Sequence, residues 1–94
     1  MNRDTETLRL IQTLFPGRED LVEDAFRDPR FRDLCEDYSR CDAALHRWKQ
    51  LTTAESVPRR QEYTELLADL GREIETWLEA MDIAPGGRGT GVRQ

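Results

Sequence analysis

The sequence predicts an all-α protein: a long antiparallel helical hairpin with two short N-terminal helices packed on it and a disordered C-terminal tail. Apolar residues recur at helical spacing in four segments, prolines separate these segments, and the glycine-rich end has too few apolar residues to build a core. We expect residues 1–83 to form one helical domain, with the two short helices in 1–27 and the hairpin in 28–83. Residues 84–94 form the predicted tail.

The two short helices are predicted over about residues 5–15 and 18–27. Asp4 is a suitable N-cap for the first, and Pro16-Gly17 ends it. The second begins with acidic residues, which the helix dipole favours in a first turn. The apolar faces comprise Leu8, Ile11, Leu14 and Phe15 in the first helix, and Leu21, Val22, Ala25 and Phe26 in the second.

The two long helices are predicted from Pro29 to about Leu51 and from Pro58 to about Met81. Asp28 is expected to cap the first of them, because its carboxylate accepts from free N–H groups and proline at the next position lacks one. In both helices the apolar residues are three or four positions apart, as in the contact face of a coiled coil. These residues are Phe31, Leu34, Tyr38, Cys41, Leu45 and Trp48, then Tyr63, Leu66, Leu70, Ile74, Trp77 and Met81.

A short polar connection between two long helices predicts that they pack antiparallel. With the turn near residues 55–56, the predicted layers are Trp48 with Tyr63, Leu45 with Leu66, Cys41 with Leu70, Tyr38 with Ile74, Leu34 with Trp77 and Phe31 with Met81. Glycine inside a helix costs about 1 kcal/mol relative to alanine. Gly71 therefore indicates a close helix approach or the space beside Tyr38, unless it is merely tolerated.

Composition and charge disfavour several classes of partner. The chain has 94 residues, 35 % of them charged, and a net charge of −5. The acid concentrates on the last predicted helix, whereas nucleic acids and anionic membranes attract a basic surface. No stretch approaches the roughly 20 apolar residues that span a bilayer, and the first four residues lack an apolar signal segment. We therefore expect a cytoplasmic protein without a membrane partner, and the charge disfavours a nucleic-acid partner.

The two cysteines are not expected to form a disulfide. Cys35 and Cys41 lie six positions apart, about 9 Å along a helix, whereas a disulfide needs Cα atoms within about 7 Å. Glu36 and Asp37 flank Cys35 and would raise its pKa, which disfavours a reactive thiolate. Both cysteines are interpreted as small buried hydrophobic residues, with Cys35 placed to widen the apolar stripe.

No cofactor, metal ion or small-molecule substrate is indicated. His46 lies four residues after Asp42 on one helix face, but Cys35 is about 16 Å away along the axis, too far to share an ion with His46. The glycines of 87–91 follow a helix instead of a strand, so they do not form a nucleotide-binding loop. The carboxylates of the last helix are expected to face solvent, or alternatively to bind a basic partner. We therefore expect no enzymatic activity.

The hairpin resembles the small uncharacterised bacterial helical-hairpin proteins of the YdcH-like kind. The likeness covers residues 28–81 and rests on 28–38, with its Pro-x-Phe-x-x-Leu entry, on Ala43-Ala44-Leu45 and Trp48, and on Glu62-Tyr63 with Leu66-Leu67. The resemblance implies a bacterial protein with a hairpin fold and no catalytic residue. This sequence differs in having Cys41 and a tryptophan in each long helix.

These observations favour a non-catalytic module for protein–protein interaction or self-association. A lone hairpin leaves half of its apolar surface wet, and either the leading helices or a second copy must cover it. We expect a homodimer, or a complex with another helical protein. The alternatives are a nucleic-acid-associated regulatory hairpin and a small thiol- or histidine-dependent enzyme. The candidate interface residues are Leu8, Ile11, Phe15, Cys35, Leu67 and Leu78.

Overall fold

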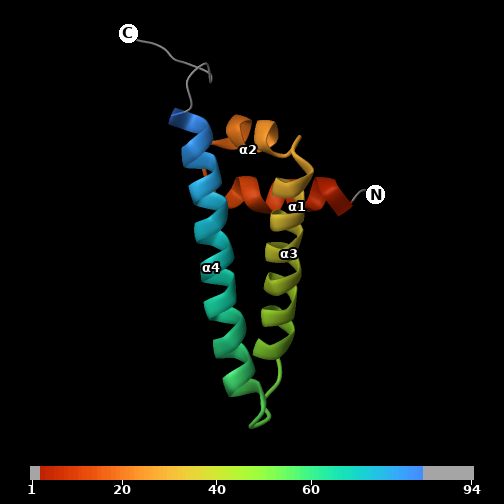
Figure 1. Cartoon of the computed structure of the whole chain (residues 1–94). Coiled ribbons are helices and arrows are strands. Elements are labelled where there is room, and N and C mark those ends of the chain that lie inside the picture. The colour runs from red at the N-terminus through yellow and green to blue at the C-terminus, as the bar shows by residue number, and fades with distance from the viewer. Residues whose placement is uncertain (1–2, 84–94) are drawn as a thin grey trace.

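The fold is all-α, as the sequence predicts. A computed structural model describes residues 3–83, with side chains up to 82, and contains no strand within them; the predicted tail, 84–94, lies outside the described residues. Helices α3 and α4 lie side by side and antiparallel, and α1 and α2 run across one end of this hairpin (Figure 1). The helices are α1 (Arg3–Leu14), α2 (Glu19–Ala25), α3 (Pro29–Lys49) and α4 (Ser56–Ile83).

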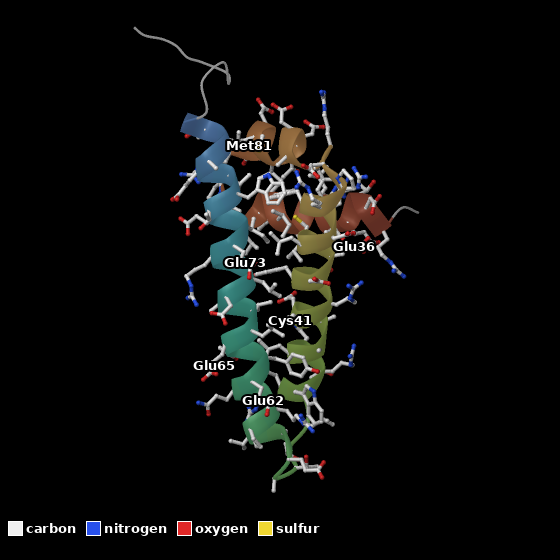
Figure 2. All side chains as sticks on the ribbon, in the orientation of Figure 1. Glu36, Cys41, Glu62, Glu65, Glu73 and Met81 are labelled. Atoms are coloured by element: carbon white, nitrogen blue, oxygen red, sulfur yellow. The ribbon has the colours of Figure 1, made fainter. Side chains whose placement is uncertain are left out.

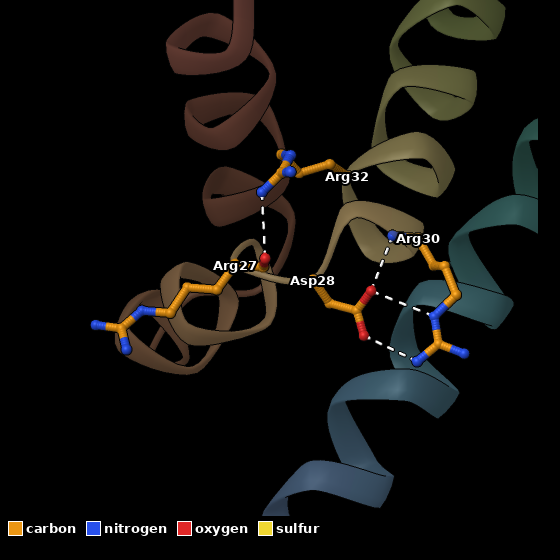
Figure 3. Close-up of polar contacts among 4 residues, drawn as sticks. All are labelled: Arg27, Asp28, Arg30 and Arg32. Carbon is orange, nitrogen blue, oxygen red and sulfur yellow. Dashed lines mark hydrogen bonds and ion pairs between the residues drawn. The ribbon is translucent and has the colours of Figure 1, made fainter.

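The junction between α2 and α3 is held by local hydrogen bonds (Figure 3). The Asp28 carboxylate caps α3 by accepting from the backbone N–H of Arg30 at 2.9 Å, and it also accepts from the Arg30 guanidinium at 3.0 Å. These bonds lower the pKa of Asp28. Arg32 donates to the carbonyl oxygens of Phe26 at 2.7 Å and Arg27 at 3.3 Å. The predicted capping by Asp28 is confirmed, and these contacts set the direction in which α3 leaves the N-terminal helices.

The turn between α3 and α4 has the predicted length but lies two residues earlier in the chain, because α3 ends at Lys49. Helix α4 begins at Ser56, two residues before Pro58. The backbone N–H and the hydroxyl of Ser56 donate to the carbonyl oxygen of Thr53, at 3.1 and 2.7 Å. Pro58 is then the third residue of α4, where a backbone N–H has no partner within the helix and proline loses nothing.

The core lies at the end of the hairpin that α1 and α2 cover. Phe31 is fully buried at its centre, with Phe26 edge-on at a ring-centroid distance of 6.4 Å and Trp77 tilted at 5.4 Å. The amphipathic short helices thus bury their apolar stripes against both long helices. The core residues are Ile11, Leu21, Val22, Ala25, Phe26, Phe31, Cys35, Tyr38, Ile74 and Leu78.

The predicted register of the hairpin is wrong by about one helical turn. Phe31 contacts Trp77, where the prediction paired it with Met81. The Tyr38 ring lies beside Gly71, where the prediction paired Tyr38 with Ile74. The cause is that α3 ends and α4 begins about two residues earlier than predicted, which moves the turn toward the N-terminus and shifts every layer. Gly71 does lie beside Tyr38, but a Cβ atom there would be 3.6 Å from the ring, an ordinary van der Waals distance, so the space does not require glycine.

Candidate interaction surface

Half of the hairpin consists of two helices without a covering layer. Helix α1 packs on α3, and α2 packs on α4, near the junction of α2 and α3 (Figure 1). Toward the turn, nearly every side chain of α4 is exposed or only partly buried. A two-helix layer encloses little core of its own, so apolar groups of α4 such as Leu66 remain accessible in this half, whereas Cys41, Ala44 and Leu45 of α3 are buried between the helices.

A groove runs between α3 and α4 on one face of the hairpin, and no residue of α1 or α2 lines it. It consists of two depressions, whose α3 residues follow one another at intervals of three or four positions and so share a helix face. We call it the α3–α4 groove. The first depression is lined by Leu34, Asp69, Arg72, Glu73, Thr76, Trp77 and Ala80, and the second by Asp37, Arg40, Cys41, Ala44, Arg47, Tyr63, Leu66 and Leu70.

The floor of the groove toward the turn is apolar. Cys41 lies between the two long helices (Figure 2), and its thiol donates to the carbonyl oxygen of Tyr63 at 3.4 Å. Burial and the nearby Asp42 raise the pKa of Cys41, so this thiol stays protonated. Leu66 is 47 % exposed here, beside the partly buried Leu70. The shifted register explains this exposure, because it moves Leu66 out of the contact that the sequence predicted for it.

The two rims of the groove carry different charges. On α3, Arg40 pairs with both Asp37 and Glu36, while Arg47 makes no ion pair within the described residues. On α4, Arg72 pairs with Asp69 next to the carboxylate of Glu73. Figure 2 shows Glu62, Glu65 and Glu73 following one another along α4. These ion pairs are exposed and individually weak, so the charges remain available to a partner.

The predicted interface residues lie mostly inside the chain. Ile11, Cys35 and Leu78 are fully buried in the core, so in this conformation they offer no area to a partner. The remaining three, Leu8, Phe15 and Leu67, are partly buried and pack against that core. Sequence reasoning missed the groove with Leu66 at its floor, because the position of the turn determines which leucines of α4 meet α3, and the prediction placed the turn about two residues too late.

The groups proposed for chemistry do not meet. Cys35 is a free thiol without exposed area, and burial raises its pKa to about 12. His46 is exposed on α3, whereas Asp42 is half-buried. Among the described residues, no group of three histidine, cysteine or carboxylate side chains is placed to hold a metal ion. No helix within residues 3–83 combines the length and the apolar character needed to cross a membrane.

No protein-family model matches the sequence, and no significantly similar curated protein or solved structure was found. The resemblance to YdcH-like hairpins therefore stays a prediction. What the chain does must be argued from its own surface.

Proposed function

We propose that this chain is a small non-catalytic protein-interaction module that binds a helical partner through the α3–α4 groove. The observation that carries the proposal is one-sided coverage of the hairpin. Helices α1 and α2 bury one end of the hairpin, while the groove keeps Leu66 half exposed on an apolar floor. A contiguous exposed apolar surface with a charged rim is typical of an interaction site, and helices commonly bind in such grooves.

The chemistry of the chain supports a non-catalytic role. A nucleophilic cysteine must be accessible as a thiolate, whereas Cys35 and Cys41 are buried and have raised pKa values. Two unpaired thiols also suit the reducing cytoplasm, which we include in the proposal. The net charge of −5 does not suit binding to a phosphate backbone.

Site-specific photo-crosslinking in living cells tests the proposal. The photoreactive residue benzoylphenylalanine is placed at position 66, in the groove, and in a control chain at position 64. Thr64 is exposed and lies about 200° around α4 from Leu66. The two positions are neighbours in sequence, so expression level and local concentration are matched.

We expect a discrete crosslinked product from position 66 and little or none from position 64. Peptide mass spectrometry of the product then shows whether the partner is another protein or the chain itself. Equal crosslinking at both positions, or none at position 66, would contradict a role for the groove.

A further inference from the structure

We propose that the α3–α4 groove binds a second copy of this chain, in a two-fold dimer where α3 of each protomer lies against α4 of its partner. This inference rests on the proposed function, because it names the partner of the same groove. It is carried by the charges of the two rims and by the dimensions of the groove.

The two rims have opposite net charge. The α3 rim toward the turn carries Arg40 and Arg47 against the single carboxylate of Asp37. The α4 rim carries Asp69 and Glu73 against Arg72, and Glu62, which pairs with Arg59 at 3.1 Å, lies one turn beyond Leu66. A surface with a basic side and an acidic side can complement an identical surface, provided that the symmetry brings unlike sides together.

Only one of the two face-to-face arrangements brings unlike rims together. A two-fold axis perpendicular to the helices places α3 on α3 and α4 on α4, so acid meets acid along α4. An axis parallel to the helices places the basic rim of α3 against the acidic rim of the partner's α4. Both axes make every neighbouring pair of helices antiparallel, as is usual in a four-helix bundle, so the charges of the rims decide between them.

The register of the hairpin predicts which charges meet. Rotation about an axis parallel to the helices leaves the position of each residue along that axis unchanged. Each residue of the partner's α4 therefore lies at the same level along α3 as the corresponding residue of the chain's own α4. The contacts of Phe31 with Trp77 and of Tyr38 with Gly71 fix this level.

Arg47 is nine residues beyond Tyr38, and Glu62 is nine residues before Gly71. Arg47 therefore lies close to the level of the partner's Glu62. Arg47 has no ion-pair partner within the described residues of its own chain, so in the dimer it would join the exposed ion pair that the partner's Glu62 makes with its own Arg59.

The dimensions of the groove suit a stable dimer. Helix α3 has 21 residues, which gives a length of about 30 Å, and two packed helices are about 20 Å wide. The projected face is therefore roughly 600 Å², and surface relief brings the buried area per protomer toward the roughly 800 Å² typical of stable interfaces. Small side chains such as Ala44 in the groove leave room for the partner's Leu66.

Charge reversal at one predicted pair tests the dimer. Arg47→Glu and Glu62→Arg are each made singly and combined in one chain, and self-association is measured by sedimentation velocity. Both positions are exposed, and circular dichroism checks that each variant is folded. Each single variant places two like-charge contacts in its homodimer, so we expect its dissociation constant to rise by about tenfold or more.

An equimolar mixture of the two single variants provides the decisive control. In the mixed dimer both contacts again join a glutamate to an arginine, so we expect association to return to near the wild-type level, as it should in the double variant. If residues 47 and 62 interacted within one chain, only the double variant would regain wild-type association and the mixture would not. This result would contradict the proposed pairing.

Two other outcomes overturn the dimer. A wild-type chain that stays monomeric from about 1 to 100 μM contradicts self-association. A wild-type dimer that neither single variant weakens contradicts the proposed arrangement. The proposed function is tested separately, by the crosslinking contrast between positions 66 and 64. If position 66 alone crosslinks, and does so to a different protein, the dimer is contradicted while the proposed interaction function is supported.

Discussion

Replacement of Gly71 by alanine should stabilise the protein. Gly71 lies within α4, where glycine costs about 0.8–1.0 kcal/mol relative to alanine. A Cβ atom built there meets Tyr38 Cε2 at 3.6 Å, an ordinary van der Waals distance, so no steric penalty offsets the gain. We expect the free energy of unfolding to rise by about 1 kcal/mol, which corresponds to an increase in Tm of about 4–8 °C for a domain of this size.

Gly17→Ala is the matched control for this prediction. Gly17 has a φ of +87° and no atom within 4 Å of a built Cβ, so only the backbone conformation opposes alanine. The left-handed conformation costs an L-residue roughly 1–2 kcal/mol, and we expect a loss of stability of about 1 kcal/mol. Urea denaturation followed by circular dichroism measures both variants. A destabilised Gly71→Ala would refute the hairpin register, because it would place a closer neighbour at position 71.

Three further predictions concern the core, the junction and the thiols. Leu78→Ala should lower the free energy of unfolding by about 2–5 kcal/mol in urea titrations, whereas Leu66→Ala should cost less than about 1 kcal/mol at concentrations that keep the chain monomeric. Folding lowers the pKa of Asp28 below its ordinary value of 3.8, so the Asp28 carboxylate stabilises the protein above that pH and loses this effect as the pH falls through the lowered pKa. Asp28→Asn should therefore reduce the dependence of Tm on acidic pH. A thiol reagent at neutral pH should leave Cys35 unmodified until denaturant is added, and early modification would contradict its burial.

The sequence was sufficient to predict the helices and their order, because each depends on local signals. Asp28 and Pro29 together mark the start of α3, and the spacing of apolar residues identifies its contact face. The all-α hairpin with two short N-terminal helices follows from such signals.

The register and the groove could not be predicted in the same way. Pro58 indicates a helix start, but proline is tolerated throughout the first turn, and the hydrogen bonds of Ser56 to Thr53 begin α4 earlier. An error of two residues in the turn moves Leu66 from a predicted buried contact to the open groove. It is this small shift, which depends on tertiary packing, that determines the candidate surface.

Sedimentation equilibrium of three chains at matched concentration tests the groove dimer most directly. They are the wild type, Leu66→Ser, and Leu51→Ser as a control with 46 % exposure outside the groove. One chain has a mass of 11.0 kDa. We predict that the wild type and Leu51→Ser approach twice this mass as concentration rises, while Leu66→Ser stays near that of one chain with its helical content unchanged. Equal masses for all three chains would contradict the dimer.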